Sequence, residues 1–155
     1  MRVFPEFQGP MAKWPRVEAM PRAKNTLATL WPTWVIGLGT NAADSSATDI
    51  REALAMVGLG VWVDRVYCRA NTGHSKPSPE FFAHILTDLH LDASRVVMVG
   101  DTYEADILGA RRVGMRAVWF NQRSTKTRSG RAIGTIHDLG DLERLLRLWR
   151  VGAEA

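Results

Sequence analysis

The sequence lacks the features that disulfide-bonded, membrane-spanning and secreted proteins require. Its 155 residues include one cysteine, Cys68, so no disulfide can form within the chain. No apolar run approaches the roughly 18 residues of a membrane-spanning helix. Residues 1–21 lack the uninterrupted apolar segment of a secretory signal. These absences predict a cytoplasmic protein without a membrane partner.

Positive charge exceeds negative charge in the sequence. Lysine and arginine number 20 against 16 for aspartate and glutamate, so the formal net charge is +4. The excess gathers in a late basic stretch without a nucleic-acid-binding motif or stacking aromatic residues. We therefore expect a solvated face and no nucleic-acid partner, with attraction for anionic substrates as a milder consequence. The stretch contains Arg111, Arg112, Arg116, Arg123, Lys126, Arg128 and Arg131.

Apolar segments of strand length and helix length alternate along most of the chain. Residues 1–20 carry regularly spaced prolines and are predicted to form an irregular arm. Residues 21–150 are predicted to form one α/β domain with a parallel sheet between two layers of helices. Helices are expected at 21–31, 49–57, 79–89, 103–113 and 138–149, and strands at 34–38, 66–68, 95–100, 117–120 and 135–136.

Two aspartates lie at the end of the apolar run that begins at Val96. The run predicts a buried strand, and Gly100 places Asp101 at its carboxyl end, where open α/β sheets bind ligands. Asp106 falls in the first turns of the next helix. Two carboxylates without a nearby cysteine or histidine favour Mg²⁺ over zinc. In the alternative interpretation, Asp101 caps the helix and Asp106 is a solvated helix residue.

Two other predicted loops carry groups suited to a phosphate. Thr40 and Asn41 follow the first strand, and a hydroxyl beside backbone amides can bind phosphate oxygens. Lys76 precedes a helix N-terminus, where its charge and the helix dipole both attract an anion. Each residue also has an ordinary structural explanation, because turns are rich in such side chains.

In this order and spacing, the three segments resemble motifs of the haloacid dehalogenase-like (HAD) superfamily of phosphatases and phosphotransferases. The resemblance covers approximately residues 18–147. The second motif of the superfamily is similar to residues 35–41, the third to residues 76–79, and the fourth to residues 100–106 with Gly114 and Met115 after them.

The resemblance implies a role for each of these residues. Thr40, with Asn41, would bind phosphate oxygens, and Lys76 would stabilise the charge of the phosphate. Asp101 and Asp106 would position Mg²⁺. Positive charge around the transferred group is the main contribution to phosphoryl-transfer catalysis, so these roles are chemically consistent.

The superfamily's first motif, Asp-x-Asp at the end of the first strand, is absent, since no aspartate precedes Asp44. The resemblance therefore implies a truncated, three-layer Rossmann-like core without the family's first, central strand and without most of its cap. That loss would leave two apolar sheet edges. Three arrangements would close the gap: direct pairing of the two edges, insertion of residues 2–4, or contacts from a second copy. We expect a homo-oligomer, a dimer.

The leading functional hypothesis is a weak Mg²⁺-dependent phosphatase of small phosphate monoesters, in which metal-activated water replaces the missing aspartate. Asp44 is a further candidate for a base or metal ligand, and its structural alternative is a turn or capping residue. The competing hypothesis is a catalytically inactive domain that binds a phosphorylated ligand or a protein partner. The functional hypotheses depend on the loops of Thr40, Lys76 and Asp101 converging on one pocket.

Overall fold

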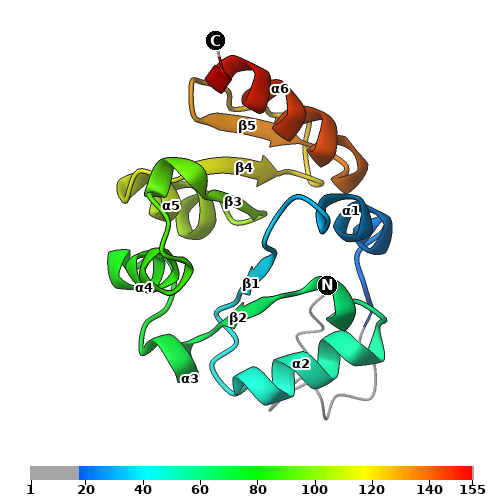
Figure 1. Ribbon diagram of the computed structural model, residues 1–155, viewed down its shortest axis with the longest axis vertical. Helices are drawn as coiled ribbons and strands as arrows, with labels where there is room; N and C mark the ends of the chain where they lie inside the picture. Colours follow the sequence, from blue (N-terminus) through cyan, green and yellow to red (C-terminus); the bar gives the residue numbers. More distant parts are fainter. Residues whose placement is uncertain (1–17, 155) are drawn as a thin grey trace. The chain divides into compact units, whose positions relative to one another are not determined.

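The computed structural model describes residues 18–154 and divides the chain into two compact units. The first unit ends at Ser75 and the second begins at Lys76. Each unit contains its own parallel sheet, labelled in Figure 1. The predicted α/β class with parallel strands is confirmed, whereas the prediction of one continuous domain over residues 21–150 stays a prediction.

The first unit is built around a two-stranded parallel sheet in which Gly37 pairs with Arg65. A Cβ atom at Gly37 would lie 3.0 Å from Cε2 of Tyr67, so a larger residue here would press against the tyrosine ring. The Asp64 carboxylate accepts hydrogen bonds from the amide of Ile36 (2.8 Å) and from Nε1 of Trp31 (3.2 Å). The elements are α1 (Ala23–Leu30), β1 (Gly37–Gly39), α2 (Ala47–Met56), η2 (Gly60–Trp62), β2 (Arg65–Tyr67) and α3 (Arg69–Thr72).

The second unit contains a three-stranded parallel sheet in the order β3-β4-β5, in which Gly100 pairs with Trp119 and Trp119 with Thr135. A Cβ atom at Gly109 would lie 2.6 Å from Cε2 of the fully buried Phe82, so glycine allows α5 to approach α4 closely. The elements are α4 (Pro79–Leu89), η3 (Ala93–Arg95), β3 (Val97–Gly100), η4 (Tyr103–Leu108), α5 (Gly109–Arg112), β4 (Arg116–Phe120), β5 (Ile133–Ile136), η5 (Leu139–Asp141) and α6 (Leu142–Glu154).

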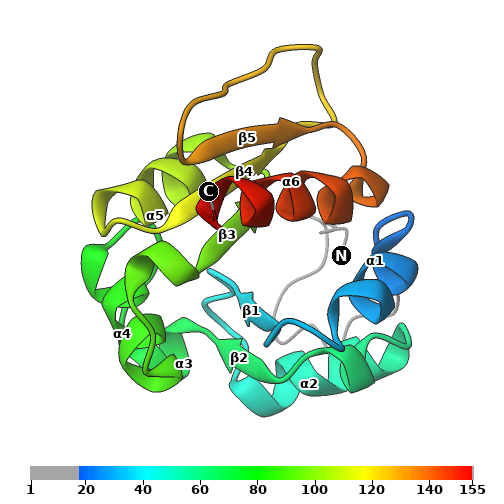
Figure 2. The same ribbon diagram turned by 45° about the horizontal axis from the view of Figure 1, so that its top comes forward.

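Helices cover both faces of the sheet in the second unit. Side chains alternate between faces along a strand, so Gly134 and Thr135 point in opposite directions. On the face of Gly134, α6 packs so closely that a Cβ atom there would lie 2.8 Å from Leu145 Cδ2. On the opposite face, the ring of Trp119 meets Tyr103 of η4. Figure 2 shows α6 in front of this sheet. These three layers agree with the predicted architecture.

Some elements differ in extent from the sequence-based expectation. β1 begins at Gly37 rather than at residue 34, and Val35 is 60% exposed. The helix expected at 103–113 consists of a π-helical turn, η4, followed by α5. Most of the predicted arm, including residues 2–4, lies outside the described residues. In residues 18–154, no helix is both long and apolar enough to cross a membrane.

Candidate functional site

A buried ion pair between Lys76 and Asp106 lies at the centre of the candidate site. The ammonium Nζ of Lys76 is 2.6 Å from Oδ1 of Asp106, and the two side chains are 11% and 5% exposed. Lys76 is the first residue of the second unit, immediately before the Pro77–Pro79 segment that leads into α4, whereas Asp106 lies in η4. The structure therefore joins two predicted site residues that are 30 positions apart in sequence.

The turn after β3 holds the Asp106 carboxylate from its other side. The Thr102 amide donates a hydrogen bond to Oδ2 of Asp106 (3.0 Å), and the Asp106 amide donates one to the Thr102 carbonyl (2.8 Å). Both carboxylate oxygens of Asp106 are therefore engaged. Burial of a carboxylate requires such compensation, because an unpaired charge away from water is costly.

Gly100 is required by the close approach of this carboxylate to the strand. A Cβ atom at position 100 would lie 2.2 Å from Oδ2 of Asp106 and 2.4 Å from its Cγ. Asp106 cannot move away without breaking its bonds to Lys76 and Thr102. Glycine at position 100 thus has a steric reason, because the Asp106 carboxylate occupies the place of a side chain.

We expect Gly100→Ala to lower the free energy of unfolding by about 3 kcal/mol, because an added methyl group in a packed site forces its neighbours apart. Urea denaturation followed by tryptophan fluorescence measures the change. Gly130→Ala is the matched control: a Cβ atom there meets nothing within 4 Å, so we expect a change within about 0.5 kcal/mol. Equal stability of the two variants would contradict the steric role of Gly100.

Asp101 is exposed at the carboxyl end of β3, next to the buried pair. Its Oδ1 atom accepts a hydrogen bond from the Thr102 hydroxyl (3.2 Å), and its backbone carbonyl accepts one from Nε1 of Trp119 (3.1 Å). The Trp119 ring packs edge-on against Tyr103, with centroids 5.1 Å apart. The backbone at Asp101 is thus held by a neighbouring strand while its carboxylate faces solvent.

The carboxylates of this site are oxygen ligands of the type that Mg²⁺ prefers. Mg²⁺ usually keeps several waters and takes one or two protein carboxylates together with substrate phosphate oxygens. Among the residues that the structure describes, no group of three or more histidine, cysteine, aspartate or glutamate side chains could hold a metal. Asp101 offers an exposed carboxylate, whereas metal binding by Asp106 would compete with Lys76 and the Thr102 amide. The assignment of both as metal ligands stays a prediction.

The other predicted site residues belong to the first unit. The Thr40 amide donates to the carbonyl of Tyr67 (2.9 Å), and the Thr40 hydroxyl accepts a hydrogen bond from the Ala42 amide (3.1 Å). Asn41 and Asp44 follow β1 and are exposed. The convergence of the Thr40 loop with Lys76 and Asp101 therefore stays a prediction.

Sequence reasoning missed Thr102, Tyr103 and Trp119, which shape the turn around Asp101. No local signal identifies Trp119, because its hydrogen bond to Asp101 joins residues 18 positions apart. The sequence pattern places Gly100 at the end of a strand and at the start of the fourth motif, but it does not show the steric reason for glycine at this position. Contacts of this kind depend on strand register, which the sequence pattern leaves open.

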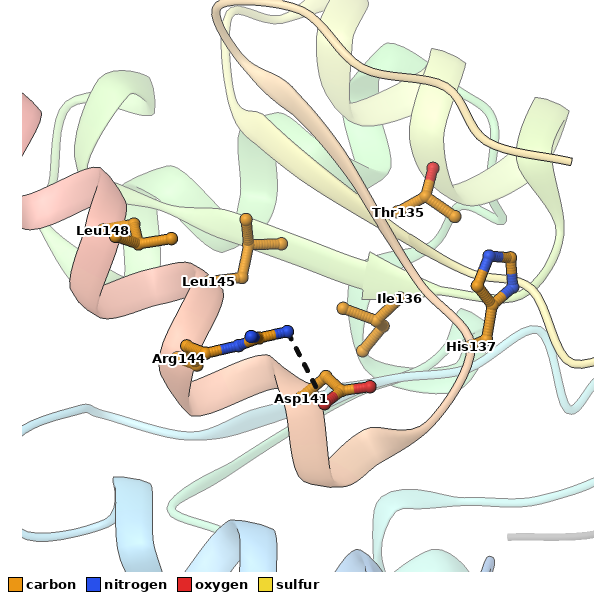
Figure 3. Close-up of a pocket in the computed structure, with 7 residues that line it drawn as sticks. All are labelled: Thr135, Ile136, His137, Asp141, Arg144, Leu145 and Leu148. Atoms are coloured by element: carbon orange, nitrogen blue, oxygen red, sulfur yellow. Dashed lines mark ion pairs between the residues drawn. The ribbon is translucent and has the colours of Figure 1, made fainter. Parts of the chain in front are cut away.

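A pocket of about 380 Å³ lies elsewhere in the second unit, between the end of β5 and the first turns of α6 (Figure 3). An ion pair of 3.9 Å joins Asp141 and Arg144 at its wall. None of the predicted site residues lines it, so this pocket does not contribute to the candidate site. The lining residues are Thr135, Ile136, His137, Asp141, Arg144, Leu145 and Leu148.

Comparison with known proteins identifies the family to which the chain is similar. Residues 74–139 match the model of a family described as HAD-hydrolase-like. The chain is 36% identical over 137 residues to a ribulose-1,5-bisphosphate 5-phosphatase of Halopiger xanaduensis, with 79% of this chain and 56% of the relative covered. It is 33% identical over 129 residues to the pyrimidine 5′-nucleotidase YjjG of Escherichia coli, with 82% and 56% covered.

A solved structure gives the same result. The crystal structure of a HAD phosphatase from Thermococcus onnurineus matches with a TM-score of 0.70 and 30% identity, over 82% of this chain and 57% of that one. The chain thus spans little more than half the length of the curated relatives named above. The family model, the curated relatives and the solved structure agree, and the chain belongs to the haloacid dehalogenase-like superfamily of hydrolases.

Proposed function

We propose that the chain hydrolyses small phosphate monoesters with the help of Mg²⁺. The observation that carries this proposal is the Lys76–Asp106 pair, which fixes a cation and the turn of Asp101 at the end of β3. Relatives named as a bisphosphate 5-phosphatase and a 5′-nucleotidase support the reaction class. The substrate is therefore a small molecule with at least one phosphate ester.

Each residue of the site has a distinct task in this proposal. Asp101 would hold Mg²⁺, which supplies positive charge against the phosphate oxygens when bound. Lys76 stabilises the negative charge on the transferred group, and Asp106 positions the Lys76 ammonium through their 2.6 Å contact. Asp106 is thus a positioning residue for Lys76. Thr40 and Asn41 would bind phosphate oxygens if their loop lies at the same site.

Water is the nucleophile in the proposed reaction, and a bound Mg²⁺ would favour the loss of its proton. The water oxygen forms a bond to phosphorus while the bond from phosphorus to the ester oxygen breaks. The leaving alkoxide takes up a proton, so the products are an alcohol and inorganic phosphate. Asp44 is the candidate base for the proton that water loses. We expect slow turnover, because the proposed reaction uses no covalent intermediate.

A second candidate function is a domain that binds a phosphorylated ligand without cleaving it, and it is favoured by the engagement of both Asp106 carboxylate oxygens with Lys76 and Thr102. Lys76 and the Thr102 turn would attract the phosphate in both cases. Only the hydrolase requires Mg²⁺-dependent release of inorganic phosphate. The two functions therefore differ in a measurable product.

Phosphate release from a panel of small phosphate monoesters, with Mg²⁺ or with EDTA, tests the proposal. We expect release with Mg²⁺ that EDTA abolishes. Binding of the same esters, measured by isothermal titration calorimetry, is the parallel readout. Binding without release by the purified chain would favour the second function, and neither binding nor release would contradict both.

Self-association is part of the proposed function. Among residues 18–154, β3 is an outer strand of its sheet. The bond from the Arg116 amide to the Val96 carbonyl indicates that Val97 and Val99 direct their backbone groups away from β4. An apolar strand edge of this kind favours pairing with a second copy. We expect a homodimer in light scattering coupled to gel filtration, and a monomer at all concentrations would contradict this expectation.

A further inference from the structure

Positive charge dominates a long segment next to the candidate site. Between Ile107 and His137 every formally charged side chain is a cation. Arg111 donates to the carbonyl of Met115, the Arg116 guanidinium lies 5.7 Å from the ring centroid of Trp149, and Arg128 contacts a ring as described below. The remainder of the charge needs another explanation. The full set is Arg111, Arg112, Arg116, Arg123, Lys126, Arg128 and Arg131.

The loop between β4 and β5, which carries much of this charge, is held in a defined shape. Figure 2 shows this connection as a long, extended loop beside β5. Near its start, the buried Asn121 side chain donates to the Ser124 hydroxyl (2.8 Å) and to the Lys126 carbonyl (3.0 Å). Farther along, the Thr135 hydroxyl accepts from the Arg128 amide and donates to the Arg128 carbonyl, each at 2.8 Å. The backbone of Arg128 is therefore fixed to β5.

Arg128 differs from the other cations of this loop. Its guanidinium carbon lies 5.6 Å from the ring centroid of Tyr103. By contrast, the side chains of Arg123, Lys126 and Arg131 have no hydrogen bond or ion pair to another described residue. The hydrogen bonds of Arg128 to Thr135 are made by its backbone, and a cation held over an aromatic ring keeps its guanidinium N–H donors for another group.

A short chain of contacts connects Arg128 with Asp101. Tyr103 packs against Trp119, and Trp119 donates its indole N–H to the carbonyl of Asp101. The loop also leaves β4 at the end of the sheet where Asp101 leaves β3, because the strands are parallel and Gly100 pairs with Trp119. Arg128 is thus held at the rim of the candidate phosphate site.

We propose that Arg128 is a specificity-determining residue that binds a second anionic group, a phosphate or a carboxylate, of the phosphate ester bound at Asp101; this inference rests on the phosphate site of the proposed function. The guanidinium fork pairs with either group through two parallel N–H donors. The preferred ligands therefore carry two anionic groups, and ligands with one phosphate bind more weakly.

Isothermal titration calorimetry in the presence of Mg²⁺ tests this inference with two matched pairs of probes. Fructose 1,6-bisphosphate against fructose 6-phosphate measures the effect of a second phosphate. 3-Phosphoglycerate against glycerol 3-phosphate measures the effect of a carboxylate. Inorganic phosphate is assayed after each titration to correct for turnover. We expect the wild type to prefer the ligand with two anionic groups in at least one pair by about 10-fold.

Arg128→Ala should abolish that preference and change the affinity for the single-phosphate ligand by less than about 2-fold. Arg128→Lys should restore only part of it, because lysine keeps the charge but not the planar fork. Arg131→Ala is the matched control, since it removes the same charge from the same loop just before β5 begins, and it should leave the preference intact.

Each result decides the inference. An unchanged preference in Arg128→Ala, or an equal loss in Arg131→Ala, overturns it. The absence of a preference in the wild type, or of any binding by the phosphate esters, overturns it as well. If the wild type shows the preference and Arg128→Ala loses it but no phosphate is released, the inference holds and the hydrolase function fails.

Discussion

Replacing Asp106 with alanine is expected to lower the free energy of unfolding by about 3–5 kcal/mol, because the substitution removes the carboxylate of a buried ion pair and leaves the charge of Lys76 in place. Lys76 is only 11% exposed and lies 2.6 Å from Asp106, so water cannot fully replace the lost carboxylate. The Thr102 amide loses its acceptor at the same time. Urea denaturation of the purified variant, followed by tryptophan fluorescence, measures the loss.

Glu104→Ala provides the control for this substitution. Glu104 is an exposed carboxylate in the same element, η4, and its removal should change stability by less than about 0.5 kcal/mol. The double variant Lys76→Met with Asp106→Leu should recover much of the stability lost in Asp106→Ala, because it removes both charges together. Similar stabilities for Asp106→Ala and Glu104→Ala would show that the ion pair does not support the fold.

The second large effect concerns activity. Asp101→Asn is expected to lower kcat/KM for phosphate release by at least about 100-fold, because the variant loses the negative charge that attracts Mg²⁺ to the transferred phosphate. Its stability should stay near that of the wild type, since the side chain is exposed and accepts one hydrogen bond, from the Thr102 hydroxyl. An amide oxygen can accept that bond equally well. Kinetics over a range of Mg²⁺ concentrations measures the effect.

Asp92→Asn is the matched control for Asp101→Asn. Asp92 is an exposed aspartate of the same unit, immediately before η3, and its side chain makes no capping hydrogen bond. We expect activity within about 2-fold of the wild type, as for surface substitutions that leave the site unchanged. Full activity of Asp101→Asn at saturating Mg²⁺ would remove Asp101 from the proposed site.

The sequence pattern predicted the strand and the helical segment of the fourth motif well. The apolar run before Gly100 and the helical spacing after it are local signals, so β3 and the following helix lie close to their expected positions. The pattern did not distinguish the tasks of the two carboxylates. That distinction depends on the path of η4, which buries Asp106 against Lys76 and leaves Asp101 exposed.

The sequence pattern did not predict the contacts between segments that are distant in the sequence. The hydrogen bond from Trp119 to Asp101 follows from strand register. The contact between the Arg128 guanidinium and the Tyr103 ring follows from the shape of a long polar loop. Neither feature has a periodicity that a local window detects. The boundary between the compact units at Ser75 was also not anticipated, because no linker composition marks it.

Binding of Mn²⁺, an oxygen-seeking substitute for Mg²⁺, tests most directly whether Asp101 holds a divalent cation beside the Lys76–Asp106 pair. Electron paramagnetic resonance distinguishes free from bound Mn²⁺ without any turnover. We expect the wild type to bind Mn²⁺ and Asp101→Asn to bind it at least about 10-fold more weakly, whereas Asp92→Asn binds as the wild type does. Equal Mn²⁺ affinity of the wild type and Asp101→Asn would contradict the proposed metal site.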